Sequence, residues 1–443
     1  MRTGALRRPS GMSAFLLVWV GQIVSILASA MSGFGLAIWM YQQTESATAM
    51  GLMYALYMTP FLLMSPIAGV WVDRYNRKWM MMISDLTAVV ASAGVLVLFA
   101  TGRLEFWHLY ISAVLNGVGN TFQWPAYSAA ITTMVPKEQY GRANGLMSLM
   151  DAGPGVVAPL LAGALLPVVG LRGLMALDVV TFFVAIGALW MVHVPQPVRT
   201  AAGEQGRGSM LHEAAYGFRY ILQRPSLLGL QVGFFLVNLF VGSGQSLVTP
   251  MILARTTSNS AALGMVQSAG ALGAVAGGIV MSAWGGFRRR VKGVVLGWML
   301  FSTGLAVMGT GRGVAAWLPI AFLMAMSGPL GNTSNQALWQ AKVAPDVQGR
   351  VFSTRRLIAW FATPISPIIG GALADYVLEP AMRNASGLAG LFGWLVGTGP
   401  GAGMGLWMVI CGVTGALIAI GATFVPAIRN ADTLLPDHAQ GKV

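Results

Sequence analysis

The feature that most constrains this chain is a series of long apolar blocks that recurs from one end of the sequence to the other. Each block has roughly 20 or more residues, enough for an α-helix to cross the ~30 Å hydrocarbon core of a bilayer. We therefore predict an all-α membrane protein with twelve transmembrane helices. The predicted spans are residues 13–41, 48–72, 79–101, 106–134, 143–166, 172–194, 227–253, 261–284, 293–311, 314–340, 355–378 and 405–428.

The charge content supports this prediction. Charged residues make up 9% of the 443 residues, whereas a soluble globular domain usually carries about 25%. So few charges cannot cover a water-soluble surface. The 57 glycines fit close contact between helices in a bilayer, where small residues let two backbones approach.

Basic residues alternate between the two sides of the predicted membrane. Of the 27 lysines and arginines, 22 fall on the side of the termini and 5 on the other side. Because Lys and Arg accumulate in cytoplasmic loops, we expect a multi-pass protein of the cell inner membrane with both termini in the cytoplasm. The formal charge of +13 then reflects orientation, and we expect no nucleic-acid partner.

The two halves of the chain repeat weakly, at an offset near 209 residues. For example, Gly141-Arg142 follows the fourth span, and Gly349-Arg350 follows the tenth. Such repeats are typical of transporters with two helical bundles and a substrate path between them. We also expect a short amphipathic helix at His212–Tyr220. The predicted N-terminal six-helix bundle, cytoplasmic linker, C-terminal six-helix bundle and cytoplasmic tail are residues 1–194, 195–226, 227–428 and 429–443.

The loop between the second and third spans carries a recognisable motif. It reads Gly-x-x-x-Asp-Arg-x-x-Arg-Lys, and here the sequence resembles the major facilitator superfamily. The resemblance implies the major facilitator fold and a cytoplasmic latch that holds one conformation and loosens in another. The alternative is that the loop cations only fix the topology. The predicted latch residues are Gly69, Asp73, Arg74, Arg77 and Lys78, with Asp85 as a further acidic partner.

Two other segments, residues 212–222 and 336–353, resemble the branch that holds enterobactin-type siderophore exporters and macrolide efflux proteins. Span five resembles the Gly-Pro signature of the family's exporters, although Ala158-Pro159 replaces an expected glycine pair. Proline removes a helix donor and permits a bend. We therefore predict a hinge that also seals against leak, the alternative being a tight helix contact. The hinge residues are Gly153, Pro154, Pro159 and Gly163.

Acidic residues within the spans are functional candidates, because an ionisable group is costly in hydrocarbon. Asp151 lies ten residues past Gly141 at the start of span five, which is about 15 Å into the bilayer at 1.5 Å per residue. We predict that it exchanges the coupling proton. The alternative is a packing role, with a bond to a neighbouring hydroxyl. We expect Asp178 to pair with Arg172, and we expect Asp375 and Glu379 to be solvated. Span four lacks the Arg that many proton antiporters of the resembled family carry there.

The resemblance also implies that spans one, four, seven and ten line the central path, and in this chain these spans are the polar ones. An amide that faces lipid is costly, so their side chains should face the cavity. The alternative is hydrogen bonding between helices. The predicted cavity residues are Gln22, Asn116, Asn120, Gln123, Trp124, Asn238, Gln245, Asn332, Asn335 and Gln336.

These features favour a secondary transporter that exports a small amphipathic molecule, such as a siderophore, macrolide or hydrophobic drug, by proton antiport and alternating access. The alternatives are a lipid or lysophospholipid carrier, an uptake symporter, and a non-transporting membrane sensor, because fold alone does not fix function. We expect no enzyme activity, no cofactor and no metal site, because the sequence shows no nucleophile–base constellation, no cluster of metal ligands and no nucleotide-binding motif. The single cysteine, Cys411, cannot build a disulfide framework, a zinc site or a c-type haem motif. We expect a monomer in the lipid bilayer with protons as the coupling ion.

Overall fold

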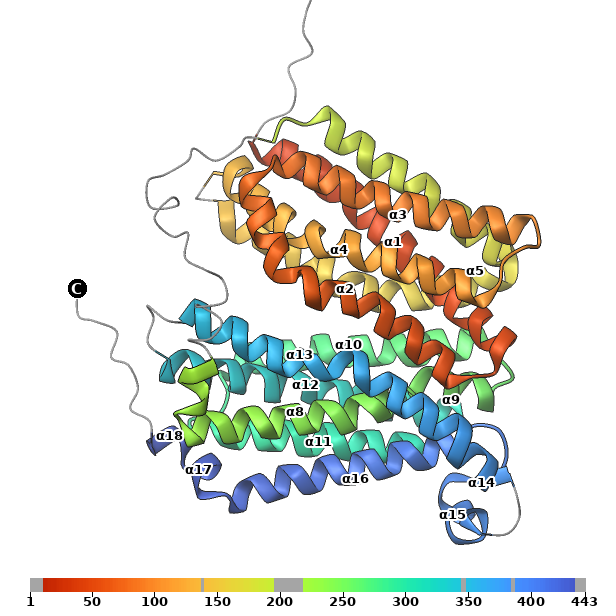
Figure 1. Cartoon of the computed structure of the whole chain (residues 1–443), viewed down its shortest axis with the longest axis vertical. Coiled ribbons are helices and arrows are strands. Elements are labelled where there is room, and N and C mark those ends of the chain that lie inside the picture. Colours follow the sequence, from red (N-terminus) through yellow and green to blue (C-terminus); the bar gives the residue numbers. More distant parts are fainter. Residues whose placement is uncertain (1–10, 137–138, 195–217, 344–347, 384–386, 435–443) are drawn as a thin grey trace, which may run out of the picture. The chain divides into compact units, whose positions relative to one another are not determined.

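The structure is a computed structural model that describes residues 11–136, 139–194, 218–343, 348–383 and 387–434. Within these ranges every regular element is a helix (Figure 1). Ten of the helices are long and apolar enough to cross a membrane. The predicted linker helix at His212–Tyr220 lies largely outside the described residues.

The chain forms two compact units. Residues 1–44 and 56–199 belong to the first unit, and residues 45–55 and 200–443 belong to the second. The helix α2 therefore begins in the second unit and ends in the first. The helices that contribute to the first unit are α1 (Gly11–Thr44), α2 (Ala47–Arg74), α3 (Arg77–Ala100), α4 (Phe106–Met134) and α5 (Tyr140–Met191).

In the first unit α1 packs along α5, and α3 packs along α4. The start of α3 is fixed by Asn76, whose side chain accepts a hydrogen bond from the backbone N–H of Lys78 at 3.0 Å. Such a bond satisfies one of the donors left open at a helix N-terminus. A Cβ atom added at Gly117 of α4 would overlap the carbonyl oxygen of Tyr57, so this glycine permits the close approach of α4 to α2.

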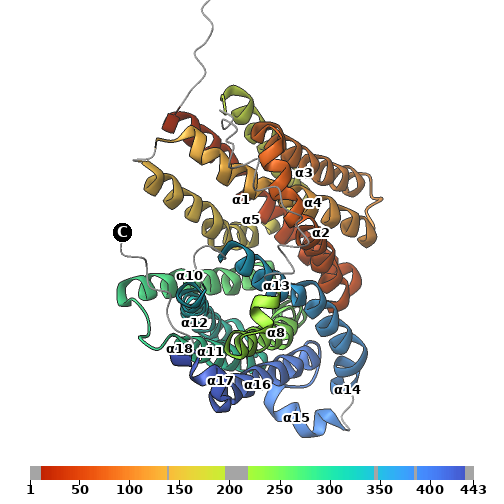
Figure 2. The same cartoon turned by 60° about the vertical axis from the view of Figure 1, so that its left-hand side comes forward.

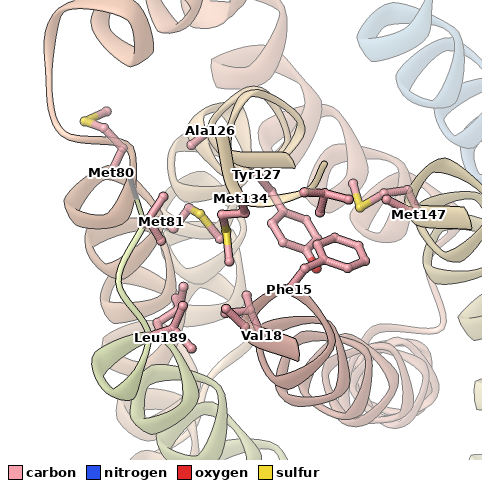
Figure 3. Close-up of a cluster of buried hydrophobic side chains, with 14 of the residues drawn as sticks. Phe15, Val18, Met80, Met81, Ala126, Tyr127, Met134, Met147 and Leu189 are labelled. Atoms are coloured by element: carbon pink, nitrogen blue, oxygen red, sulfur yellow. The ribbon is translucent and has the colours of Figure 1, made fainter. Parts of the chain in front are cut away.

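A cluster of buried apolar side chains joins the ends of these helices. It includes Phe15 and Val18 of α1, Met81 of α3, Tyr127 of α4 and Leu189 of α5 (Figure 3). The rings of Phe15 and Tyr127 stack at a centroid distance of 6.1 Å. This cluster forms a dry layer that fixes α1, α3, α4 and α5 against one another at that end of the unit.

The helix α5 is interrupted at Gly170, whose φ of 67° and ψ of 176° are not helical. Positive φ is readily adopted by glycine because it has no Cβ atom. The break separates the predicted spans 143–166 and 172–194. Pro154, Pro159 and Pro167 lie within the helical part before it.

The second unit is also helical, and α8, α11 and α16 lie side by side in it (Figures 1 and 2). The predicted span 227–253 is divided between α8 and α9, and a π-helical turn, η2, follows α13. The elements of the second unit are α8 (Pro225–Gln245), α9 (Val248–Arg255), α10 (Ser260–Trp284), α11 (Arg290–Thr310), α12 (Val314–Lys342), α13 (Gln348–Leu373), η2 (Ala374–Leu378), α14 (Glu379–Arg383), α15 (Leu388–Val396), α16 (Ala402–Phe424), α17 (Pro426–Arg429) and α18 (Ala431–Leu434).

Glycines bring the helices of the second unit close together. A Cβ atom at Gly273 of α10 would overlap the carbonyl oxygen of Phe322 in α12, and one at Gly297 of α11 would overlap Gly331 of the same helix α12. These contacts agree with the packing expected of helices in a bilayer, where small residues permit close backbone contact.

Candidate functional site

A polar chamber of about 450 Å³ lies inside the first unit, between α1, α3, α4 and α5. All four helices contribute polar side chains to its wall, and α2 adds Tyr57. Among the described residues of the wall, two carry a formal charge, Asp85 of α3 and Asp178 of α5, and neither is basic. The further polar residues of the wall are Gln22, Ser25, Ser29, Ser32, Tyr57, Ser84, Ser92, Ser112, Asn116, Asn120 and Gln123.

Asp85 forms a closed triangle with two glutamines from other helices. Its Oδ2 accepts a hydrogen bond from Gln22 Nε2 at 2.9 Å, and its Oδ1 accepts one from Gln123 Nε2 at 3.0 Å. Gln123 Nε2 also donates to Gln22 Oε1 at 2.9 Å. Asp85 is 5% exposed and Gln22 is 2% exposed. The buried Oε1 of Gln123 accepts no hydrogen bond from the part of the chain that the structure describes.

Asp178 is held by two hydroxyl groups. Its Oδ1 accepts from Ser29 Oγ at 2.6 Å, and its Oδ2 accepts from Ser92 Oγ at 2.9 Å. The expected pairing with Arg172 is wrong, because Arg172 donates to the backbone oxygen of Ala100 at 3.4 Å instead. Asp178 is 2% exposed, and its carboxylate is hydrogen-bonded by neutral hydroxyl donors rather than by a cation.

The two carboxylates occupy two levels of the same helical framework. On α1, Gln22 bonds to Asp85, and Ser29, seven residues later, bonds to Asp178. On α3, Asp85 and Ser92 are likewise separated by seven residues. Seven residues are about two helical turns, or roughly 10 Å along the axis. The chamber therefore has one carboxylate at each of two levels about 10 Å apart.

The apolar cluster adjoins the Asp85 level of the chamber. Val18 of α1 lies four residues before Gln22, and Met81 of α3 lies four residues before Asp85. Residues four apart are neighbours on one helix face. The stacked pair of Phe15 and Tyr127 lies in the same layer (Figure 3). The chamber is thus bounded at that level by tightly packed apolar side chains.

The chamber gathers four of the predicted cavity residues, namely Gln22, Asn116, Asn120 and Gln123. The side chain of Trp124 lies outside the described part of the structure. The amide of Asn116 also donates to the backbone oxygen of Ser112 at 2.8 Å within its own helix. The predicted set therefore overlaps the wall of this chamber on α1 and α4, but it leaves out the serines of these two helices, Tyr57 of α2, and the wall residues on α3 and α5. Whether these residues bind a cargo stays a prediction.

The predicted cavity residues of the second unit do not form one cluster. Asn238 Nδ2 donates to the backbone oxygen of Ala359 at 3.3 Å, and Gln336 Oε1 accepts from Arg355 Nη1 at 2.9 Å. For these two residues the alternative interpretation, hydrogen bonding between helices, describes the contacts. Of the other three residues, Asn335 is buried, whereas Gln245 and Asn332 are exposed.

The predicted latch is only partly visible. The surroundings of Gly69 and the side chains of Asp73 and Arg74 lie outside the described part of the structure, and Arg77 is buried. Lys78 Nζ donates to the carbonyl oxygens of Trp190 and Val192 at 3.0 and 2.7 Å, where a helix end favours a cation.

Asp85, which we expected in the latch, is bonded instead to Gln22 and Gln123 in the chamber. The reason is its position on α3: it lies eight residues, or roughly 12 Å, beyond Arg77. The latch residues themselves stay a prediction.

The predicted hinge region of α5 is only partly described, and two of its glycines make few close contacts. The side chain of Asp151 lies outside the described residues, so its role stays a prediction. A Cβ atom at Gly153 would meet only Leu149, at 3.9 Å, and one at Gly155 would meet nothing within 4 Å. The strongest departure from helical geometry in α5 is at Gly170, which sequence reasoning did not single out as a break.

Two acids that we expected to be solvated have defined partners instead. Asp375 accepts hydrogen bonds from Ser46 Oγ at 2.6 Å and from the backbone N–H of Thr48 at 2.7 Å. Glu379 is 6% exposed and accepts from the backbone N–H groups of Met404 and Gly401 at 3.0 and 3.3 Å. Both acids therefore cap helix N-termini, where negative charge is favourable.

A family model described as Major Facilitator Superfamily matches residues 18–367. Macrolide efflux protein A of Streptococcus pyogenes is 25% identical over 377 residues, which cover 82% of this chain and 90% of that protein. The enterobactin exporter EntS of Citrobacter koseri is 23% identical over 269 residues, covering 60% of this chain and 62% of that protein.

A crystal structure also shares this fold. It is that of a bacterial homologue of the human lysosomal transporter Spinster in an inward-facing, unoccupied conformation. The two chains align with a TM-score of 0.72 at 17% identity, over 97% of this chain and 99% of that chain. At this identity the likeness concerns the fold alone.

Proposed function

The chain belongs to the Major Facilitator Superfamily, and we propose that it is a secondary transporter that exports a small amphipathic molecule. The family resemblance inferred from the loop after the second span is confirmed, as is the resemblance to macrolide efflux and enterobactin export proteins. The observation that carries the proposal is the similarity to macrolide efflux protein A, which extends over 82% of this chain and 90% of that protein.

We propose a topology of twelve spans in two six-helix bundles, with both termini in the cytoplasm and the protein in the cell inner membrane. Ten helices meet the length and hydropathy of a span. One of them, Ala152–Met191, contains the break at Gly170 and so provides two crossings. The helix α4 has 29 residues, which is long enough to cross a bilayer. The excess of basic residues on the side of the termini supports the orientation.

The chemistry of the polar residues suits an uncharged or weakly charged cargo. The first unit offers amides and hydroxyls on α1 and α4, and no described basic residue lines its chamber. A dedicated carrier of phosphate or carboxylate compounds needs basic side chains in its binding site, since Arg and Lys recognise these anionic groups. We propose a macrolide, a siderophore or a hydrophobic drug as cargo, carried by a monomer without a cofactor.

Export against a gradient requires an energy source, and we propose proton antiport with alternating access between the two bundles. In this scheme the loop motif from Gly69 to Lys78 latches one conformation, and the prolines and glycines of α5 permit the change of shape. Asp151 is the candidate proton carrier that the sequence suggests, because its position in span five predicts a location near the middle of the bilayer.

Transport into inside-out membrane vesicles tests the proposal. Labelled macrolides, siderophores and a hydrophobic dye are offered to wild type, to Asp151→Asn and to empty vesicles, with and without a protonophore. We expect uptake by wild type that a protonophore abolishes. Uptake that persists with the protonophore excludes proton coupling. If no compound on the panel accumulates, the export proposal fails, and a lysophospholipid panel then tests the lipid-carrier alternative.

A further inference from the structure

The chamber inside the first unit has an unbalanced charge. Asp85 and Asp178 are both buried in its wall, and each of their four oxygens accepts one bond from a neutral donor. No described residue of the wall is basic. A buried charge is costly unless it is paired or fully hydrogen-bonded. A positive charge that enters the chamber would therefore be stabilised there.

The chamber also has unused acceptors. A carboxylate offers about four acceptor positions, and the hydrogen bonds at Asp85 and at Asp178 use two on each. The Oε1 of Gln123 is buried beside Asp85 and accepts no hydrogen bond in the described structure. These acceptors are oxygen atoms, which suit protons and hard cations.

The spacing of the two carboxylates favours monovalent over divalent cations. The two groups lie at levels roughly 10 Å apart, whereas oxygen ligands lie about 2.3–2.6 Å from a bound Ca²⁺ ion. One divalent ion cannot contact both. In agreement, the described residues contain no group of three or more His, Cys, Asp or Glu side chains that could hold a metal ion. Each level instead presents one negative charge, which one monovalent cation neutralises.

The volume of the chamber permits movement between the two levels. About 450 Å³ is far more than one ion fills, and at about 30 Å³ per molecule it is enough for several waters. Ser25 of α1 lines the chamber and lies between Gln22 and Ser29 along that helix, at a level between the two carboxylates. Beyond Asp85 the apolar cluster closes the framework with packed side chains. A cation can thus be exchanged between two stations within the first unit.

We propose that this chamber is the binding site of the coupling cation, a proton or a sodium ion, with Asp85 and Asp178 as its two stations. The inference rests on the proposed function, because a coupling cation implies a transported cargo. It moves the coupling site from Asp151 to two carboxylates on α3 and on the part of α5 beyond Gly170. Gln22, Gln123, Ser29 and Ser92 act as positioning residues that hold the carboxylates in place.

A transport experiment in proteoliposomes tests the assignment. It compares wild type with Asp85→Asn, Asp178→Asn and Asp151→Asn, and with Glu105→Gln as a control, because Glu105 is an exposed acid outside the chamber. Gradient-driven accumulation is measured beside cargo-for-cargo exchange, which needs no coupling ion. Separate proton and sodium gradients identify the cation. We expect both chamber variants to lose accumulation by about tenfold, a usual size for coupling between sites, and to keep exchange.

Other results overturn the proposal. Full accumulation in both chamber variants excludes the chamber from coupling, and loss confined to Asp151→Asn returns the role to Asp151. Loss of exchange together with accumulation, in variants that remain folded, assigns Asp85 and Asp178 to cargo binding or to structure instead.

A labelling experiment decides the site without any cargo. Dicyclohexylcarbodiimide converts a protonated carboxyl group in an apolar site into an acylurea, which mass spectrometry locates. For purified wild type we expect modification of Asp85 or Asp178, suppressed at alkaline pH if the cation is a proton and by sodium but not choline if it is sodium. No modification, or modification that neither condition suppresses, overturns the proposal. Because this result needs no transport, it separates failure of the cation site from failure of the export function.

Discussion

At the residue scale, the position of Asp178 depends on hydroxyl groups from two other helices. Replacing Ser29 by Ala removes the 2.6 Å bond to Oδ1 and leaves a buried carboxylate short of a donor. A hydrogen bond to a charged group is worth about 1.5–3 kcal/mol, so we expect Ser29→Ala to lower the melting temperature of the purified protein. Ser282→Ala is the matched control, because Ser282 is exposed and bonds within its own helix. Equal melting temperatures for the two variants would contradict this role.

The partners of Asp178 also mark the limit of sequence reasoning for single residues. Its depth in span six was readable from hydropathy, and its neighbour Arg172 was a reasonable partner within one helix. The observed partners are 149 and 86 residues away. No local pattern specifies such distances, because the packing of α1 and α3 against α5 decides them. The same holds for Asp85, whose partners lie on α1 and α4.

At the element scale, two glycines in neighbouring helices offer a matched test of close packing. A Cβ atom at Gly117 of α4 would overlap the carbonyl oxygen of Tyr57, whereas one at Gly94 of α3 would meet nothing within 4 Å. We expect Gly117→Ala to destabilise the protein by about 1–3 kcal/mol through overpacking. Gly94→Ala should stabilise it by about 0.5–1 kcal/mol, since Ala is the better helix former. Thermal unfolding in detergent measures both, and a loss of stability in both variants would refute the packing argument.

The N-terminus of α2 depends on a carboxylate from the other end of the chain. Asp375 accepts hydrogen bonds from Ser46 Oγ and from the backbone N–H groups of Ala47 and Thr48. Loss of such a cap costs about 0.5–2 kcal/mol. We expect Asp375→Ala to speed hydrogen–deuterium exchange at residues 46–50 and Asp375→Asn, which keeps an acceptor, to do so less. Unchanged exchange in Asp375→Ala would show that Asp375 does not cap α2.

Element boundaries show what the sequence could and could not supply. The helix α15 (Leu388–Val396) has a clear local signal in the sequence, because it is an apolar run that lies between Gly387 and Gly397. The break of α5 was placed between two spans, but its cause, a positive φ at Gly170, was missed among the many glycines of this chain. The split of span seven into α8 and α9 was also missed, since the apolar pattern continues across it.

At the scale of the whole molecule, the orientation predicted from basic residues can be tested by cysteine labelling. Cys411 is fully buried, so Cys411→Ala provides a background without other thiols. In that background Thr101→Cys lies in the exposed connection from α3 to α4, and Arg288→Cys lies in the connection from α10 to α11. Because Lys and Arg favour the cytoplasmic side, a membrane-impermeant maleimide should label Thr101→Cys in intact cells and Arg288→Cys only after permeabilisation. The two connections are separated by five crossings in the proposed topology, an odd number. Labelling of both from the same side would therefore require a different number of spans between them and would remove the twelve-span arrangement, whereas the reverse pattern would keep the arrangement and invert its orientation.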